Sequence, residues 1–377
     1  MKIAIGMHIQ EGAFGGGNQF GKHLTQFLRQ QGHEVFFDLR EPRLDLILMT
    51  DPRTSLRSVA FGPLQIMRYV QRINPSVLLV HRINECDERK DTKTLNRFLS
   101  TANNIMDHTV FISSWLEQLH QDQNPFTKSY SVILNGADRS IFSYQKHRLP
   151  SDQGYEPLFA SPRSVELNST LASSRNRKIR LVTHHWSGNW KKGWDVYMHL
   201  DHLLATTELG DRLTFSYIGN APAQAALQAI QVIPPKSGGE LARELHQHDL
   251  YITASLNEPA GMHHIEAALC GLPLLYRMSG ALPEYCHEYG VPFEDSSDVL
   301  RSLETLIANY DQYAHKLAGY PNDAQTMCGA YTRLFETILA QKSEILASRP
   351  NKRFNTFHRF QKMLSLTLLP SANLSHF

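Results

Sequence analysis

The sequence predicts an α/β protein made of two doubly wound, Rossmann-like domains. Its 377 residues exceed one ordinary core and suit two domains of moderate size. Short apolar segments alternate with amphipathic ones in both halves, which is the pattern of parallel strands joined by helices. A polar stretch with several prolines, residues 143–177, interrupts the alternation, and we interpret it as a linker or excursion between the domains. Ligands bind beyond the carboxyl ends of such strands, so we expect the site in a cleft between two facing domains.

The first predicted domain, residues 1–142, opens with a strand, a glycine-rich loop and a helix. The segment KIAIGM is apolar enough for a buried strand, and the loop contains the three glycines at positions 15–17. Asn18 can cap the helix that follows, and Gly32 is expected to end it. Later strands are expected at residues 33–37, 45–49, 77–80, 110–112 and 132–134, with helices near 65–72 and 115–121.

The second predicted domain, residues 178–345, repeats the alternation. A helix early in this domain places Val196, Leu200, Leu203 and Leu204 on one face. Strands are expected at residues 179–183, 213–218, 230–233, 250–254 and 273–276. The remaining residues, 346–377, form a basic C-terminal segment.

Composition excludes several classes of protein. The apolar content of 42% and charged content of 20% describe a folded globular chain, and a net charge of +2 is too small to indicate nucleic-acid binding. No apolar run reaches the ~18 residues of a membrane helix, and the N-terminus turns polar too soon for a signal peptide. Four scattered cysteines without CxxC spacing favour a reduced, cytoplasmic setting. Neither HExxH nor Asp-x-Asp accompanies the 19 histidines, so we expect no metal or other cofactor.

Two loops have the chemistry to meet a phosphate group, and each also has an ordinary explanation. Glycines 15–17 precede a helix start, where backbone amides and the helix dipole favour an anion. Their spacing matches neither GxGxxG nor GxxxxGK[ST], so a plain flexible turn fits equally well. In the second domain, Lys191, Lys192 and Gly193 lie between the first strand and its helix. A lysine there could meet a diphosphate as a point charge, or the pair could form a solvated basic loop.

The most informative stretch is EPAGMHHIEAALCGLP, residues 258–273. A buried-type strand precedes it, so Glu258 is expected in the loop at the carboxyl end of that strand. We expect a helix from about Met262, with Glu266 about one turn inside it and Gly271 at its end. A carboxylate can accept hydrogen bonds from vicinal hydroxyls such as those of ribose. Two surface glutamates are the alternative, although Glu266 precedes an apolar run.

This block resembles the Glu-x7-Glu signature of the retaining GT-B glycosyltransferases, especially family 4. SGALPEY (residues 279–285) stands where that family has Gly-Gly-x-Pro-Glu, and NGADRSIF (135–142) resembles the Asn-Gly-Val-Asp segment that ends its first domain. GGGNQFGKHLTQFLRQQGHEV resembles the family's first loop, helix and second strand, and WKKGWDV resembles its Lys-Gly element. The similarities follow one another in order from residue 1 to about 340, which is most of the chain.

The resemblance implies a role for each matching residue. Glu266 would hold the ribose hydroxyls, Glu258 the hydroxyls of the transferred sugar, and Lys192 the charge of the leaving diphosphate. His81, after the strand at 77–80, resembles the histidine that lies near the donor sugar, or is an ordinary loop histidine. The implied catalytic residues are Glu258, His81 and Lys192. The implied donor-binding residues are Gly16, Gly17, Lys191, Gly261, Met262, His263 and Glu266. Backbone amides near these glycines would approach the phosphates or the sugar.

One position departs from the family pattern. An arginine usually precedes the Lys-Gly element by five residues and faces the diphosphate, whereas this sequence has Ser187 there. Either Lys191 or a nearby histidine replaces the arginine, or the phosphate is held more loosely.

Two charged segments are candidates for contact with an acceptor or a membrane. The segment HRINECDERKDT, residues 81–92, is expected to face the cleft, and a solvated loop would fit its charges equally well. Its acceptor-side candidates are Arg82, Asn84, Glu85 and Asp87. The basic segment 346–377 is either a closing helix that crosses back onto the first domain or a patch that binds an anionic membrane surface.

Together these features predict a retaining, metal-independent glycosyltransferase. It would move a sugar from a nucleoside-diphosphate donor to a glycan or lipid-linked acceptor, in surface polysaccharide or glycolipid biosynthesis. We expect it in the cytoplasm, with peripheral contact to the membrane as an option. Two alternatives stay open, namely a sugar-nucleotide epimerase or phosphorylase of the same architecture, and a non-catalytic nucleotide-sugar-binding partner subunit.

Overall fold

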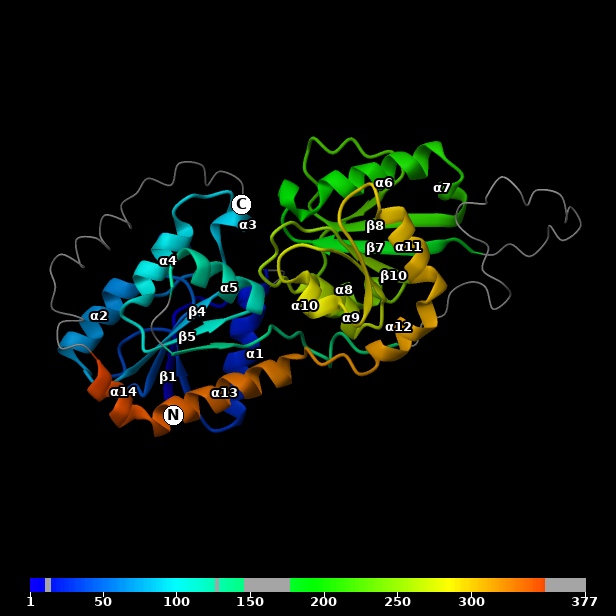
Figure 1. Ribbon diagram of the computed structural model, residues 1–377. Coiled ribbons are helices and arrows are strands. Elements are labelled where there is room, and N and C mark those ends of the chain that lie inside the picture. The colour runs from blue at the N-terminus through cyan, green and yellow to red at the C-terminus, as the bar shows by residue number, and fades with distance from the viewer. Residues whose placement is uncertain (11–14, 126–128, 146–176, 350–377) are drawn as a thin grey trace, which may run out of the picture. The chain divides into compact units, whose positions relative to one another are not determined.

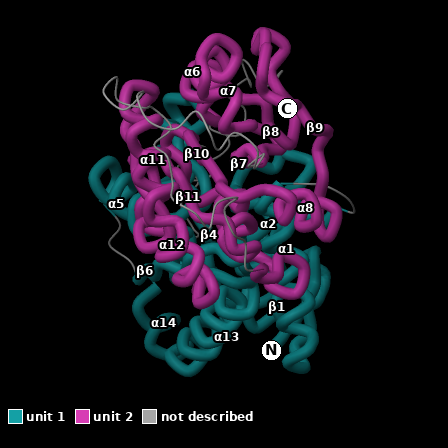
Figure 2. Tube along the Cα trace, turned by 90° about the vertical axis from the view of Figure 1, so that its right-hand side faces the viewer, with its two compact units in different colours: residues 1–136, 322–377 teal, residues 137–321 magenta. Residues whose placement is uncertain are grey.

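The structure is a computed structural model that describes residues 1–10, 15–125, 129–145 and 177–349. The chain divides into two compact units (Figure 2): unit 1 comprises residues 1–136 together with 322 onward, and unit 2 comprises residues 137–321. Across the described ranges, none of the helices combines the length and the apolarity needed to cross a membrane.

Unit 1 is a parallel six-stranded sheet in the order β2-β1-β3-β4-β5-β6, with helices packed on it (Figure 1). Its strands are β1 (Lys2–Ile5), β2 (Glu34–Phe36), β3 (Leu46–Met49), β4 (Leu78–Ile83), β5 (His108–Phe111) and β6 (Ser129–Val132). Its helices are α1 (Gly16–Gln30), α2 (Pro63–Arg72), α3 (Asp87–Lys90), α4 (Leu95–Asn103), α5 (Ser114–Gln123), α13 (Ala324–Ala340) and α14 (Lys342–Ser348). The strand order reverses between β1 and β3, as in other doubly wound sheets.

Alternation along each strand of unit 1 distributes its apolar side chains to both faces of the sheet. One face packs against α1 and α13, and its core includes Ile3, Leu48 and Phe20. The other face packs against α2 through residues such as Ile47 and Ile66. Both faces are therefore covered by helices, which is why a central strand such as β3 (LILM) is apolar throughout rather than alternating.

The C-terminal part of the chain returns to unit 1 earlier than the sequence predicted. We predicted a second domain up to residue 345 and a crossing after it, but α13 already packs on α1. The ring centroids of Phe20 and Tyr331 lie 5.1 Å apart, and Phe335 continues the same buried stripe. An apolar stripe shows that a helix is packed but not which helix receives it, so the pattern fits either domain. The first boundary also differs, since unit 1 ends at residue 136 rather than 142.

The end of the described chain is held to unit 1 by an arginine. The guanidinium of Arg349 donates to the carboxylate of Asp107, with Nε 3.0 Å from Oδ1, and to the Pro75 carbonyl at 2.8 Å. The rest of the basic segment, including the membrane patch predicted for it, lies outside the described residues. Most of the predicted linker does too.

Unit 2 is a second parallel six-stranded sheet, in the order β12-β11-β10-β7-β8-β9. Its strands are β7 (Ile179–His185), β8 (Leu213–Gly219), β9 (Gln231–Ile233), β10 (Leu250–Thr253), β11 (Leu274–Arg277) and β12 (Gly290–Phe293). Its helices are η1 (Trp190–Lys192), α6 (Trp194–Thr206), α7 (Leu209–Arg212), α8 (Gly238–Leu245), α9 (His263–Leu269), α10 (Leu282–Cys286), α11 (Val299–Ala308) and α12 (Tyr310–Leu317). The prediction of two doubly wound α/β domains is confirmed, whereas their arrangement across a cleft stays a prediction.

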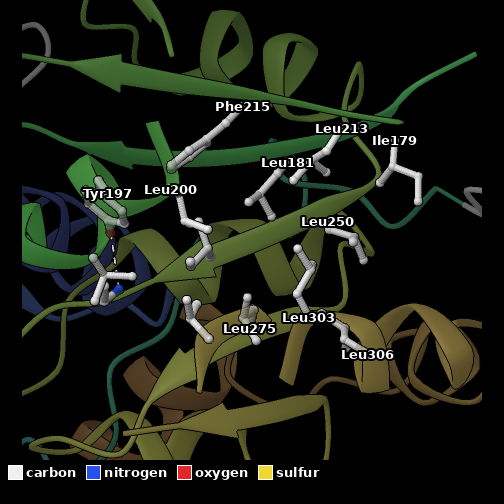
Figure 3. Packing of buried hydrophobic residues seen from close by; sticks show 14 of the residues in the cluster. Ile179, Leu181, Tyr197, Leu200, Leu213, Phe215, Leu250, Leu275, Leu303 and Leu306 are labelled. Carbon is white, nitrogen blue, oxygen red and sulfur yellow. Dashed lines mark hydrogen bonds between the residues drawn. The ribbon is translucent and has the colours of Figure 1, made fainter. Parts of the chain in front are cut away.

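The core of unit 2 lies between its sheet and helices α6 and α11. Figure 3 shows Leu181, Phe215 and Leu250 of the sheet packed with Leu200 of α6 and Leu303 of α11. This packing leaves the carboxyl ends of β7 and β10 side by side, because the two strands are paired neighbours. The strand order reverses at this pair, which is where ligands bind in open parallel sheets.

Candidate functional site

The candidate site lies where the strand order of unit 2 reverses. Strand β7 ends with His184 and His185, and the loop that carries Glu258 follows β10. A backbone hydrogen bond joins the loop after β10 to the loop after β7: the Leu256 amide donates to the Lys191 carbonyl at 2.8 Å. The local sequence explains why the chain leaves the sheet after β10. Pro259 cannot extend the strand, and Asn257 adopts a left-handed φ of 49° that turns the chain.

An ion pair between Lys192 and Glu258 is the first feature of this site. The Lys192 Nζ atom lies 2.7 Å from Glu258 Oε2, and the two side chains are 11% and 7% exposed. Lys192 comes from η1 after β7, while Glu258 comes from the loop after β10. The structure thus joins two residues that the sequence assigned to the diphosphate and to the transferred sugar. Both charges are held out of bulk water, so each depends on the other.

The segment SGALPEY (residues 279–285) forms hydrogen bonds with the loop that carries Glu258. The Ala281 amide donates to the Glu258 carbonyl at 2.8 Å, and the Asn257 amide donates to Ser279 Oγ at 2.9 Å. Gly280 has a φ of +63°, and a Cβ atom there would lie 2.4 Å from the Glu258 backbone nitrogen. Glycine is required at this position because the two backbone segments approach so closely. The motif therefore shapes the loop on which Glu258 stands.

A hydrogen bond between Glu266 and His184 is the second feature. Glu266 lies one turn inside α9, as predicted, and its Oε2 is 2.8 Å from His184 Nε2. The two side chains are 13% and 9% exposed, respectively. The sequence contains His184 and His185 as an adjacent pair, but it predicted neither as a partner of this glutamate. The sequence signal for this contact was a pair of polar residues at the carboxyl end of a strand. Its partner, Glu266, could be identified only from the order of the strands in the sheet.

The histidines behind these carboxylates are turned inward. The His263 ring, predicted to bind the donor, has its Nε2 2.9 Å from Thr253 Oγ1 and is 6% exposed. Its ring centroid lies 4.6 Å from that of His185. Burial, and then the neighbouring His185, hold the pKa of His263 well below its usual value, and burial lowers the pKa of His264 to about 3. These rings are neutral packing groups, so a donor contact at position 263 would have to use the backbone.

The geometry around these histidines does not suggest a metal centre. Across the described ranges, no three histidine, cysteine, aspartate or glutamate side chains are grouped so that they could hold a metal ion. The expected independence of metal stays a prediction.

Ser187, at the position of the family's arginine, stabilises the loop between β7 and η1. Its Oγ accepts from the Asn189 amide at 3.2 Å, and the Asn189 side chain accepts from the Lys191 amide at 2.9 Å. His185 is 3% exposed and bonds the Tyr197 hydroxyl at 3.0 Å, so it is directed into the core. Lys191 is partly exposed, and its role as a substitute for the arginine stays a prediction.

In unit 1, the predicted glycine loop is shorter than expected. Gly16 and Gly17 belong to the first turn of α1, and Gly15 is the residue before it. The predicted capping role of Asn18 is wrong, because the helix starts two residues before it. The Asn18 side chain instead makes two hydrogen bonds of 2.8 Å with the backbone of Gln10. An ideal Cβ added at Gly17 would meet no heavy atom of the described residues within 4 Å, so a side chain would fit there.

His81 lies inside strand β4 rather than in a loop, because that strand continues to Ile83. Its ring is fully buried, and Nδ1 lies 3.1 Å from Asn103 Oδ1. Burial lowers the pKa of His81 to about 4, so the ring is neutral near pH 7. A charged role for this histidine near a donor would need a different environment, and its predicted catalytic role stays a prediction.

Two of the predicted acceptor contacts have structural partners instead. The guanidinium of Arg82 is 2% exposed, lies 3.9 Å from the Phe20 ring centroid and donates to Asn135 Oδ1 at 2.9 Å. Asp87 accepts from the amides of Leu95 at 2.8 Å and Asn96 at 2.9 Å, at the start of α4. The charge run therefore lies partly on a buried strand and a helix cap, not in a solvent-facing loop.

For the other two acceptor candidates, Asn84 and Glu85, contact with an acceptor stays a prediction. Both are partly exposed, and Glu85 Oε1 lies 3.2 Å from Lys90 Nζ.

Solved structures share this architecture. HepE of Anabaena, in complex with UDP and glucose, superposes with a TM-score of 0.57 at 16% identity, covering 93% of this chain and 100% of that chain. Sucrose-phosphate synthase from Thermosynechococcus elongatus gives 0.61 at 11% identity, covering 90% and 99%. WaaG, a glycosyltransferase involved in lipopolysaccharide biosynthesis, gives 0.55 at 11% identity, covering 89% and 99%.

The two parallel six-stranded sheets match the two Rossmann-like domains of GT-B glycosyltransferases, and the predicted fold is confirmed. No protein-family model matches the sequence, and no curated protein matches it significantly.

Proposed function

We propose that this protein is a glycosyltransferase that moves a sugar from a nucleoside-diphosphate donor to a glycan or lipid-linked acceptor. The observation that supports this most is the pairing of Lys192 with Glu258 beside that of His184 with Glu266, at the strand reversal of unit 2. A cation and two carboxylates at such a point suit a ligand with a diphosphate and two sets of hydroxyls. The GT-B fold agrees with this chemistry, and HepE was solved with UDP and glucose.

In the proposed complex, each charged group meets one part of the donor. Glu266 accepts the hydroxyls of the ribose, and Glu258 accepts hydroxyls of the sugar to be transferred. Lys192, now paired with Glu258, gains the diphosphate as a second anionic partner. Its positive charge then stabilises the negative charge that develops on the leaving nucleoside diphosphate as the bond between the sugar and the diphosphate breaks.

The finer features of the reaction come from the resemblance to family 4 of the retaining enzymes. The acceptor attacks from the side that the leaving group departs, so the anomeric configuration is retained. Lysine and backbone amides stabilise the leaving group without a metal ion. A role in surface polysaccharide or glycolipid synthesis, in the cytoplasm or at its membrane face, completes the proposal.

Thermal unfolding with and without nucleotides tests the donor site. Wild type is heated with UDP, GDP, ADP, CDP or dTDP, each with and without Mg²⁺. A nucleotide at about 100 times its Kd is expected to add about 2.7 kcal/mol of stability. Glu266→Ala is expected to lose the shift, while Glu240→Ala, an exposed carboxylate of α8, keeps it. A wild type that none of the five nucleotides stabilises would exclude this donor site.

Turnover separates the alternatives. A non-catalytic binding subunit would show the nucleotide shift but would release no nucleoside diphosphate from a nucleotide sugar, with or without acceptor. Ser187 in the place of the family's arginine is the observation that favours this alternative. An epimerase would convert the sugar without an acceptor, and a phosphorylase would require inorganic phosphate. The proposed transferase requires an acceptor for rapid release of the nucleotide.

A further inference from the structure

Three side chains form a continuous chain of hydrogen bonds that ends on Glu266. The hydroxyl of Tyr251 lies 3.2 Å from Nδ1 of His184, and Nε2 of His184 lies 2.8 Å from Oε2 of Glu266. Tyr251 is fully buried, and the His184 ring packs edge-on against it with centroids 5.5 Å apart. The chain crosses from β10 through β7 to α9, so it depends on the strand pairing and not on local sequence.

The chemistry of these groups sets the direction of each hydrogen bond. A carboxylate oxygen only accepts, so Nε2 of His184 must carry the proton that faces Glu266. In the neutral ring Nδ1 is then an acceptor, and the Tyr251 hydroxyl is the donor beside it. Burial raises the pKa of Tyr251 well above its usual value, so the hydroxyl keeps its proton. This assignment gives each ring nitrogen of His184 one hydrogen-bond partner.

The same contacts orient the carboxylate. Oε2 of Glu266 is occupied by His184, whereas Oε1 makes no hydrogen bond in the part of the chain that the structure describes. A free glutamate side chain rotates about three bonds, but a carboxylate held at one oxygen presents the other in a defined direction. Holding the acceptor in place before the ligand arrives lowers the entropic cost of binding.

We propose that His184, supported by Tyr251, is a positioning residue that aims Glu266 at the ribose of the donor. The inference rests on the proposed function, because it assigns a partner to the glutamate that would bind the ribose. His184 itself touches no part of the nucleotide. It determines how strongly the site distinguishes a nucleotide with ribose hydroxyls from one without them.

The test compares a ribonucleotide with an analogue that lacks both hydroxyls. Calorimetry measures Kd for UDP, GDP, ADP and CDP and for their 2′,3′-dideoxy forms, with wild type, His184→Leu and His184→Gln. Wild type is expected to prefer the best ribonucleotide over its dideoxy form by at least about tenfold, the value of one good hydrogen bond to a charged group. His184→Leu is expected to lose most of that preference by weakening the ribonucleotide alone. His184→Gln, whose amide nitrogen can donate to Oε2, is expected to restore part of it.

Each other result overturns the inference. If His184→Leu weakens both forms equally, His184 maintains the pocket as a whole and positions nothing. If the preference is unchanged, Glu266 does not depend on His184, although the proposed function stands. If wild type binds none of the nucleotides, the proposed function fails and the inference fails with it. Should His184→Leu not fold, Tyr251→Phe keeps the His184 ring and removes the hydroxyl that contacts Nδ1 and the His184 backbone. An unchanged preference in that variant overturns the inference as well.

Discussion

From the Lys192–Glu258 ion pair we predict how the free energy of unfolding changes when either charge is removed, and this prediction does not depend on any ligand. Replacing Lys192 by Met removes the charge and keeps most of the side-chain volume, which leaves the Glu258 carboxylate buried without its cation. Replacing Glu258 by Gln removes the opposite charge but keeps an acceptor oxygen for the ammonium. The double variant removes both charges. The three variants form a double-mutant cycle with wild type.

The structure determines the expected magnitude. At 2.7 Å, two unit charges in a medium of effective dielectric constant about 20 attract each other by about 6 kcal/mol. Desolvation of side chains that are only 11% and 7% exposed opposes most of that gain when the pair forms. Removing one partner withdraws this attraction while the other side chain stays desolvated, so Lys192→Met is expected to destabilise unit 2 by about 3 kcal/mol. Glu258→Gln is expected to cost less, and the double variant to lie within about 1 kcal/mol of wild type.

Urea unfolding followed by tryptophan fluorescence measures these differences. Three of the four tryptophans, at positions 186, 190 and 194, lie in unit 2, and the last of them is fully buried. Lys316→Met, an exposed lysine of α12, is the matched control and is expected to change the free energy of unfolding by less than about 0.5 kcal/mol. The reasoning is refuted if Lys192→Met costs no more than the control, or if the double variant costs the sum of the single ones.

Two further predictions concern buried histidines and the start of α1. His81 and His264 have an ordinary pKa of 6.5 when unfolded and about 4 and about 3 when folded, so the unfolded chain binds more protons below pH 6.5 and stability falls as the pH is lowered from there. His264→Leu is expected to reduce that loss by up to about 1.4 kcal/mol per pH unit in urea titrations between pH 6.5 and 4.5, and an unchanged slope would show that the ring is not buried neutral. Gly17→Ala adds a Cβ that meets nothing within 4 Å, and alanine favours a helix more than glycine does, so the variant is expected to be more stable by about 0.5–1 kcal/mol. If the donor approaches the Gly17 backbone, the same variant is expected to transfer sugar more slowly. Gly239→Ala, a helical glycine of α8, is its control, and equal turnover in the two variants would remove Gly17 from the donor site.

The sequence was sufficient for the features that depend on local periodicity. Strands β7, β8, β10 and β11 lie where short apolar runs were predicted, because parallel strands covered on both faces are mostly apolar. The positions of Glu258 in a loop and Glu266 one turn inside a helix also follow from local signals, namely Pro259 and the apolar run of α9. The two doubly wound domains follow from the order of these elements, and the GT-B prediction came from the resemblance to the family.

Sequence reasoning could not place residues whose environment is set by distant parts of the chain. Arg82 and Asp87 belong to a charged run that usually faces water, yet one stacks on Phe20 and the other caps α4. Helix α13 carries an apolar stripe that would fit either domain, and only its packing against α1 assigns it to unit 1.

By itself, the sequence determined the class of fold, the elements that carry the candidate site and the kinds of groups in it. Only the tertiary structure decided which groups meet: Lys192 with Glu258 across 66 positions, and His184 with Glu266 across 82. The physical reason is that backbone periodicity is a local property, readable within a few residues. Partnership between side chains depends instead on strand order, since the pairing of β7 with β10 is what brings these residues to one edge of the sheet.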